Sequence, residues 1–138
     1  MPLYGDGLNI RDWLHVDDHC RALDLVIERG ENGQVYNVGG GNEVRNVDLT
    51  HRILELAGRS RDLIRPVADR PGHDRRYALS TNKLRGMGWQ PEVPFEEGLA
   101  ATVAWYRDNE WWWRPIKEQD EAYRAYYQAQ YGDRRPPA

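Results

Sequence analysis

The chain carries a strand–glycine–helix pattern that needs more strands than its sequence supplies. Residues 34–38 read as a short buried strand, which ends in three consecutive glycines and precedes helical spacing of apolar residues from 46 to 58. A strand that leads through a glycine turn into a helix is typical of parallel sheets, in which helices cover both faces. Residues 63–67 offer a further short strand. The sequence therefore predicts an α/β fold that looks like the second half of a larger unit.

Helices account for most of the remaining chain. Apolar residues at helical spacing predict five helices, over residues 18–29, 46–58, 81–88, 95–109 and 117–131. Asp17 or Asp18 is expected to cap the first of them. We expect one domain over residues 1–133, followed by a disordered tail over residues 134–138.

Composition excludes several classes of protein. The 138 residues carry a net charge of −3, which argues against a nucleic-acid binder that relies on neutralising phosphates. No apolar run is long enough for a membrane span, and residues 1–8 hold no signal-like core. Cys20, the single cysteine, is expected to be a buried structural thiol in a reducing compartment. We therefore expect a cytoplasmic protein that binds neither nucleic acid nor membrane.

The segment from 69 to 76 is the strongest candidate for a binding site. It places arginines around a Pro-Gly turn, inside a stretch from 59 to 91 with eight basic and three acidic residues. Arginine forks match paired phosphate oxygens, so such a loop suits a small polyanion such as a diphosphate. The alternative is a solvated surface loop whose arginines pair with nearby aspartates. The residues alone leave both interpretations open.

Other motifs give weaker indications of a functional site than the segment from 69 to 76. His15 and His19 are four residues apart, but the zinc-hydrolase glutamate is absent between them, so capping or another structural role is preferred and no metal is expected. The glycines at 39–41 match no dinucleotide or Walker pattern and indicate a turn. Asn46 is expected to be a helix N-cap. No pair of carboxylates stands out as an acid–base couple, so no catalytic residue is assigned.

Several longer stretches resemble a known family. They are PLYGDG at 2–7, IRDWL at 10–14, VDDH at 16–19, YNVGG at 36–40, DRPGHDRRYA at 69–78, GWQP at 88–91, FEEGL at 95–99 and TVAWY at 102–106. In this order they resemble the C-terminal half of an extended short-chain dehydrogenase/reductase, and within that family the dTDP-glucose 4,6-dehydratases. The stretch at 69–78 is the most specific.

The resemblance implies a substrate-binding portion without the catalytic centre. In the family, bound NAD takes hydride from the glucose, water is lost, and the hydride returns, all with groups of an N-terminal Rossmann half. None of that half's motifs occurs in these 138 residues. The chain alone is therefore expected to be inactive and to bind no NAD, with the missing half as its partner and a homodimer as the assembly.

The resemblance also assigns binding residues. Arg11 and Arg70 would hold the diphosphate of dTDP or dTDP-glucose, and Asn46 would donate to the same region. Pro2, Leu3 and Tyr4 would line the base pocket, and Tyr131 would close on the substrate. The loop over the nucleotide would consist of Asp69, Arg70, Pro71, Gly72 and His73.

Three other interpretations remain open at this point. One is the same portion of another nucleotide-sugar dehydratase or epimerase. Another is a free-standing nucleotide-binding module with no catalysis of its own. The third is a structural part that packs in an assembly and binds no ligand. In the family, residues 36–38 extend the sheet of the Rossmann half, and without it they expose backbone and apolar surface. We therefore expect the isolated chain to be marginally stable, to self-associate or to depend on a complementary part.

Overall fold

The computed structural model of the chain describes residues 1–132, and the expected tail at 134–138 lies outside the described residues, as does residue 133. The fold is α/β, as predicted. Its elements are β1 (Pro2–Tyr4), β2 (Ile10–Asp12), α1 (Val16–Arg29), β3 (Glu43–Arg45), α2 (Asn46–Leu56), a 3₁₀ turn (Arg61–Leu63), β4 (Arg65–Val67), α3 (Asn82–Gly86), α4 (Phe95–Asp108), α5 (Glu110–Gln119) and α6 (Glu121–Tyr131).

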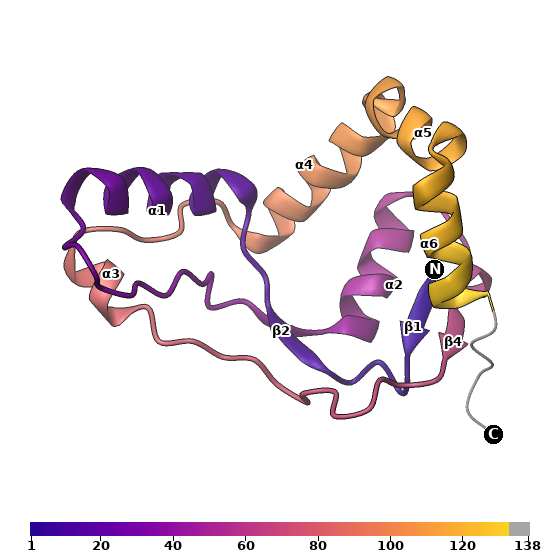
Figure 1. Cartoon of the computed structure of the whole chain (residues 1–138), viewed down its shortest axis with the longest axis horizontal. Coiled ribbons are helices and arrows are strands. Elements are labelled where there is room, and N and C mark those ends of the chain that lie inside the picture. The colour runs from indigo at the N-terminus through magenta and orange to yellow at the C-terminus, as the bar shows by residue number, and fades with distance from the viewer. Residues whose placement is uncertain (133–138) are drawn as a thin grey trace.

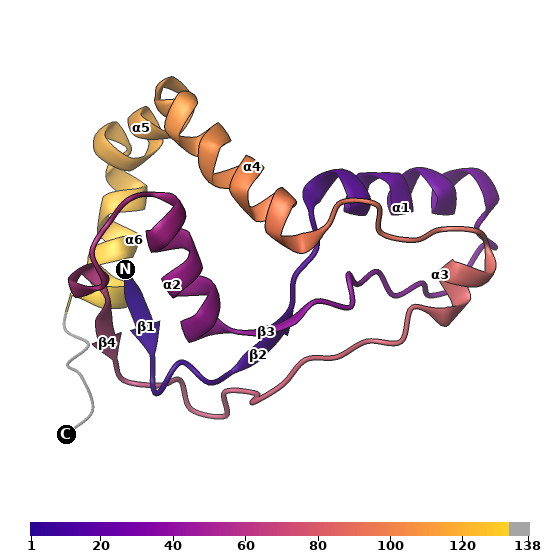
Figure 2. The ribbon, with the colours of Figure 1, turned by 180° about the vertical axis from the view of Figure 1, so that it is seen from behind.

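The elements gather at two ends of an elongated molecule (Figure 1). Helices α1 and α3 lie at one end, while α2, α6 and the strands β1 and β4 lie at the other. Long connecting segments and the antiparallel pair β2–β3 join the two ends. Helix α4 runs obliquely from beside α1 to α5, as the reverse view in Figure 2 also shows. No helix in the described part of the chain has the length and apolar character needed to cross a membrane.

Two separate strand pairs replace a continuous sheet. Strand β1 pairs with β4 in parallel, with Tyr4 opposite Val67. Strand β2 pairs with β3 in antiparallel fashion, with Arg11 opposite Val44. Among residues 1–132 each sheet has two strands. The sequence did not single out β1, β2 or β3 as strands, because three residues are too few to show an alternating pattern.

The strand predicted at 34–38 is wrong for this structure. The segment is extended but pairs with no other strand, and Val35 is 78% exposed. A strand is defined by hydrogen bonds to a neighbour, and no described segment lies where one is needed. The strand predicted at 63–67 is shorter than expected, because a 3₁₀ turn occupies Arg61–Leu63 and β4 begins at Arg65.

The helices are largely where periodicity placed them, with differences at their starts. His15 caps α1 by accepting a hydrogen bond from the Asp17 backbone N–H at 3.3 Å, so neither Asp17 nor Asp18 is the cap. Arg45 precedes α2 as its cap residue, and Asn46 is its first helical residue instead. The side chain of Asp120 accepts from the Tyr123 N–H at 3.0 Å and caps α6, so the helix predicted over 117–131 begins at Glu121. Residues 117–119 belong instead to the end of α5, which the sequence did not predict over 110–116.

Helix α1 is buried on one face alone. Ala22 packs with Leu84 and Trp89 in a small core at that end of the molecule. Asp18 is fully buried beside this core. Val16, Leu23 and Ile27, at helical spacing, are 64%, 47% and 81% exposed, so an apolar stripe on α1 faces solvent. Cys20 is also exposed, which corrects the expected buried thiol.

Candidate functional site

The loop at 69–76 lies across the ends of β1 and β2. Strand β4 leads into it, and the Gly5 N–H donates to the carbonyl of Val67 at 3.0 Å, which fixes the start of the loop beside β1. Further on, the Ile10 N–H donates to the Arg75 carbonyl at 2.8 Å, and the Tyr77 N–H donates to the Ile10 carbonyl at 3.2 Å. The loop is therefore held by the backbones of two strands that are distant from it in sequence.

A tight turn sets the positions of Arg70 and His73. The His73 N–H donates to the Arg70 carbonyl at 3.2 Å, and Gly72 has φ of +66°. Proline at the second position and a left-handed glycine at the third are the signature of a type II turn. Pro71 and Gly72 supply both, so this local sequence explains why Arg70 and His73 lie at opposite ends of one turn.

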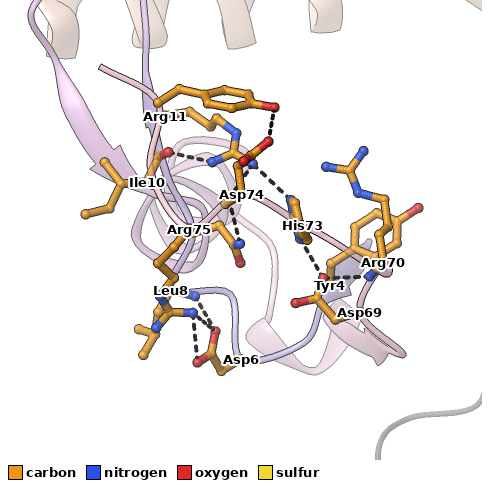
Figure 3. A network of polar contacts seen from close by, with 12 residues as sticks. Tyr4, Asp6, Leu8, Ile10, Arg11, Asp69, Arg70, His73, Asp74 and Arg75 are labelled. Atoms are coloured by element: carbon orange, nitrogen blue, oxygen red, sulfur yellow. Dashed lines mark hydrogen bonds and ion pairs between the residues drawn. The ribbon is translucent and has the colours of Figure 1, made fainter.

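Arg11 projects from β2 into the loop, where neutral groups hold it (Figure 3). Its guanidinium donates to the Ile10 carbonyl at 2.6 Å, to the Asp74 carbonyl at 3.0 Å and to Nε2 of His73 at 2.9 Å. The ring of Tyr77 lies against it, with the guanidinium carbon 4.2 Å from the ring centroid. None of these four partners is a carboxylate, so they orient Arg11 without forming an ion pair with it.

Arg70 also contacts an aromatic ring and has no carboxylate partner among the described residues. Its guanidinium carbon lies 5.5 Å from the centroid of the Tyr4 ring. In the part of the chain that the structure describes, neither Arg70 nor Arg11 forms an ion pair, whereas Arg75 pairs with Asp6 at 2.9 Å and Arg76 with Glu43 at 2.6 Å. The interpretation as a surface loop with paired arginines is therefore confirmed for Arg75 and Arg76, and the binding role of Arg70 stays a prediction.

His73 lies between the two strands with 4% of its side chain exposed. Its Nδ1 is 2.5 Å from Oδ1 of Asp69, which also accepts a hydrogen bond from the Arg70 N–H at 2.8 Å. The hydrogen bond from His73 is the largest effect on the pKa of Asp69 and lowers it; desolvation opposes this, and the hydrogen bond from the Arg70 backbone lowers the pKa further. Asp69 is thus held as a carboxylate at neutral pH.

An aromatic group forms the other side of the site. The ring of Tyr4 meets the His73 ring edge-on at 6.0 Å and lies 6.3 Å from the ring of Tyr131, at the end of α6. Gln130 donates to the Tyr4 hydroxyl at 3.2 Å. The Tyr4 hydroxyl and burial together raise the pKa of Tyr131 to about 12. Tyr4 and Tyr131, both predicted site residues, are therefore brought together, while Pro2 and Leu3 lie in β1, paired with β4.

Asn46 reaches the loop through a residue that the sequence did not single out. The Asn46 N–H donates to the Asn9 carbonyl at 2.9 Å, and the Asn9 side chain donates to the Asp74 carbonyl at 3.1 Å. Within residues 1–132 the side-chain oxygens of both asparagines are buried without a hydrogen-bond partner. The sequence did not identify Asn9, Asp74 and Tyr77 as site residues. The available signal for Asn9 was its position immediately before β2.

Gly39 and Gly40 pack against β2 and the residue after it. A Cβ atom at Gly39 would lie 2.5 Å from Oδ2 of Asp12, and one at Gly40 would overlap the Trp13 carbonyl. The Asn42 N–H donates to the other Asp12 oxygen at 2.8 Å. These glycines are therefore needed for close contact within the protein, which agrees with the turn interpretation and not with a phosphate cradle.

Comparisons with known proteins point to one family. The family model described as GDP-mannose 4,6 dehydratase matches residues 1–102. A dTDP-glucose 4,6-dehydratase of Streptomyces niveus is 53% identical over 123 residues, which cover 88% of this chain and 37% of that protein. The chain therefore spans little more than a third of the length of this relative.

Solved structures give the same result. The dTDP-glucose 4,6-dehydratase DesIV of Streptomyces venezuelae, solved with NAD and a second ligand, is 50% identical with a TM-score of 0.80, over 84% of this chain and 36% of that one. A UDP-glucose 4-epimerase of Thermus thermophilus, in complex with NAD, is 33% identical with a TM-score of 0.72, over 79% of this chain and 36% of that one.

Proposed function

This chain belongs to the GDP-mannose 4,6 dehydratase family, within the extended short-chain dehydrogenases/reductases, and on that basis we propose that it binds the dTDP portion of dTDP-glucose. The complete enzyme would be a dTDP-glucose 4,6-dehydratase, an NAD-dependent lyase that converts dTDP-glucose to dTDP-4-keto-6-deoxyglucose. The homodimer and the cytoplasmic location expected from the sequence stay predictions.

The observation that carries this proposal is the pair of arginines without carboxylate partners. Arg70 lies in one loop with Arg75 and Arg76, which are paired with carboxylates, and Arg11 of β2 projects into the same loop. A diphosphate presents two adjacent anionic groups, and each guanidinium can donate two parallel hydrogen bonds to one of them. Neutral partners orient Arg11 without neutralising it, which is what an anion site requires.

Aromatic side chains support a nucleotide over a simple diphosphate. Tyr4 lies next to Arg70 and next to Tyr131, so a base at this position would be flanked by rings. Ring stacking is tolerant of base identity, and preference for thymine over guanine would come from the backbone of β1 and from pocket size. Asn46 is connected to the loop through Asn9.

Residues 1–132 contain no glycine-rich fingerprint for NAD. Gly39 and Gly40 contact Asp12 and Trp13, so these two glycines serve close packing within the protein. Structures of the relatives contain NAD, and these chains are more than twice as long. We therefore propose that NAD and the acid–base groups belong to another part of the complete enzyme, and that these 138 residues do not dehydrate dTDP-glucose on their own.

The structure offers a surface for that part. The exposed stripe of Val16, Leu23 and Ile27 on α1 lies at the same end as the unpaired extended segment at 34–38. An apolar helix face beside an unpaired strand is what a larger sheet would cover, through backbone hydrogen bonds and apolar burial. We propose this end of the molecule as the contact with the NAD-binding part.

The proposal is tested by calorimetric titration of dTDP into the 138-residue chain and two variants. Arg70→Gln removes an uncompensated charge and is expected to weaken dTDP binding about ten- to a hundredfold, from the loss of charge-assisted hydrogen bonds. Arg75→Gln is the matched control, because this neighbouring arginine already pairs with Asp6 and should change the affinity less than about threefold.

The affinities for dTDP, UDP and GDP distinguish a dTDP-glucose 4,6-dehydratase from an epimerase. A dTDP-glucose 4,6-dehydratase should prefer dTDP to UDP and GDP, and a preference for UDP would indicate an epimerase-like specificity instead. If the chain binds dTDP no better than GDP, or if Arg70→Gln leaves the affinity unchanged, the proposed function is wrong.

A further inference from the structure

His73 contacts both Arg11 and Asp69, and each contact requires a different ring nitrogen. Nε2 is 2.9 Å from a guanidinium nitrogen of Arg11, and Nδ1 is 2.5 Å from a carboxylate oxygen of Asp69 (Figure 3). A guanidinium has donors and no acceptor, so Nε2 must accept and carry no proton. Nδ1 then carries the proton and donates it to Asp69. The two neighbours together select one neutral tautomer of His73.

We propose that His73 is a positioning residue, which holds Arg11 in place for a phosphate group and does so only as the neutral Nδ1–H tautomer. This inference rests on the proposed diphosphate site and adds the proton state in which that site is assembled. The other acceptors of Arg11 are the backbone carbonyls of Ile10 and Asp74. His73 is thus the one side-chain hydrogen-bond acceptor for Arg11 among residues 1–132, and the one whose accepting lone pair can be removed by a proton.

The His73 ring is buried among charged side chains, so a change in its protonation should affect its contact with Arg11 directly. The His73 side chain is 4% exposed, so water cannot readily replace a lost partner. The charged or titratable side chains around it come from the loop and from both strands: Asp69, Arg70 and Asp74, together with Arg11 of β2 and Tyr4 of β1. The Asp74 carboxylate accepts from the Tyr77 hydroxyl at 2.7 Å, which leaves Asp69 as the direct carboxylate partner of the ring.

Protonation would therefore break one contact and keep the other. An imidazolium ring donates from both nitrogens, so Nδ1–H still bonds Asp69 while Nε2–H meets the N–H of Arg11. Two donors and two like charges then face each other, and Arg11 must leave its position. The added positive charge would itself attract a phosphate, but Asp69 already compensates it. We expect the loss of the oriented guanidinium to be the larger effect.

The test uses dTDP-glucose, because both of its phosphates are esterified and keep the same charge between about pH 5.5 and about pH 8, unlike the terminal phosphate of dTDP. Histidine is the side chain that changes charge in this interval. In calorimetric titrations of the full chain, binding should be about tenfold weaker at about pH 5.5 than at about pH 8. Equal or tighter binding at the lower pH would overturn the proposal.

Two variants separate positioning from general stability. His73→Gln offers an amide oxygen near the place of Nε2 and cannot be protonated in this range, so it should reduce the pH dependence to less than about twofold. His73→Phe fills the space without an acceptor and should bind about tenfold more weakly at both pH values. If His73→Gln keeps the full pH dependence of the wild-type chain, another group is responsible and the proposal fails.

A measurement without nucleotide distinguishes this inference from the proposed function. Long-range ¹H–¹⁵N spectra report which ring nitrogen carries the proton, and the His73→Gln spectrum identifies the signal among four histidines. The neutral Nδ1–H form at about pH 8 supports the positioning role, and the Nε2–H form refutes it. A chain with the Nδ1–H form that binds no dTDP-glucose would instead contradict the proposed function.

Discussion

Asp18 connects the start of α1 with the segment that leads into α4, two parts of the chain that are distant in sequence. It is fully buried near the start of α1, and its two carboxylate oxygens accept from the backbone N–H groups of Glu92 at 2.8 Å and Val93 at 3.1 Å. Arg21, one turn further along α1, donates to the same carboxylate. The segment at 92–93 leads directly into α4, so this carboxylate fixes where α4 begins relative to α1.

The substitution Asp18→Asn keeps the shape and changes the hydrogen bonding. The amide has one acceptor oxygen, so one of the two backbone N–H groups loses its partner and faces an NH₂ group. A buried donor without a partner costs about 1–3 kcal/mol, and the remaining bond loses its charge assistance. The Arg21 side chain is 38% exposed, so its ion pair adds little. We expect Asp18→Asn to lower the free energy of unfolding by about 2–4 kcal/mol.

The effect is measurable by urea unfolding, followed by circular dichroism at about pH 7. A loss of this size is a large fraction of the stability of an ordinary domain and should lower Tm by roughly 8–16 °C. The matched control is Asp17→Asn, which removes the charge of a neighbouring side chain that is 70% exposed. It should change the free energy of unfolding by less than about 0.5 kcal/mol. If Asp18→Asn behaves like this control, the argument from buried hydrogen bonds is wrong.

Two further predictions concern the aromatic group and α1. Tyr4→Phe removes the hydroxyl that contributes most to raising the pKa of Tyr131. The pKa of Tyr131, about 12 in the wild-type chain, should therefore fall toward 10 in difference absorbance titrations. An unchanged pKa would show that the Tyr4 hydroxyl is not the cause. Ile27→Glu changes a side chain that is 81% exposed, and it should reduce self-association in light scattering while the free energy of unfolding stays within about 0.5 kcal/mol. Ala22→Glu, on the buried face, should unfold the chain, and equal behaviour of these two α1 variants would contradict the assigned faces.

The sequence predicted what depends on neighbouring residues along the chain. Helices α1 and α4 follow from apolar residues at helical spacing, since backbone hydrogen bonds within a helix are local. The turn at Pro71 and Gly72 follows from the conformations that these two residues prefer. The resemblance of longer motifs added the family, and it identified Arg11 and Arg70 as candidates before any contact was known.

Tertiary structure decided what depends on distant partners. Residues 34–38 have strand-like composition, yet a strand exists only where another segment supplies hydrogen bonds. The same holds for the arginines of the loop. Asp6 and Glu43, which neutralise Arg75 and Arg76, lie 69 and 33 residues away from them in the chain. Charge compensation acts through space, so composition could show that the loop is basic, and the folded chain alone could show which of its charges remain available to a ligand.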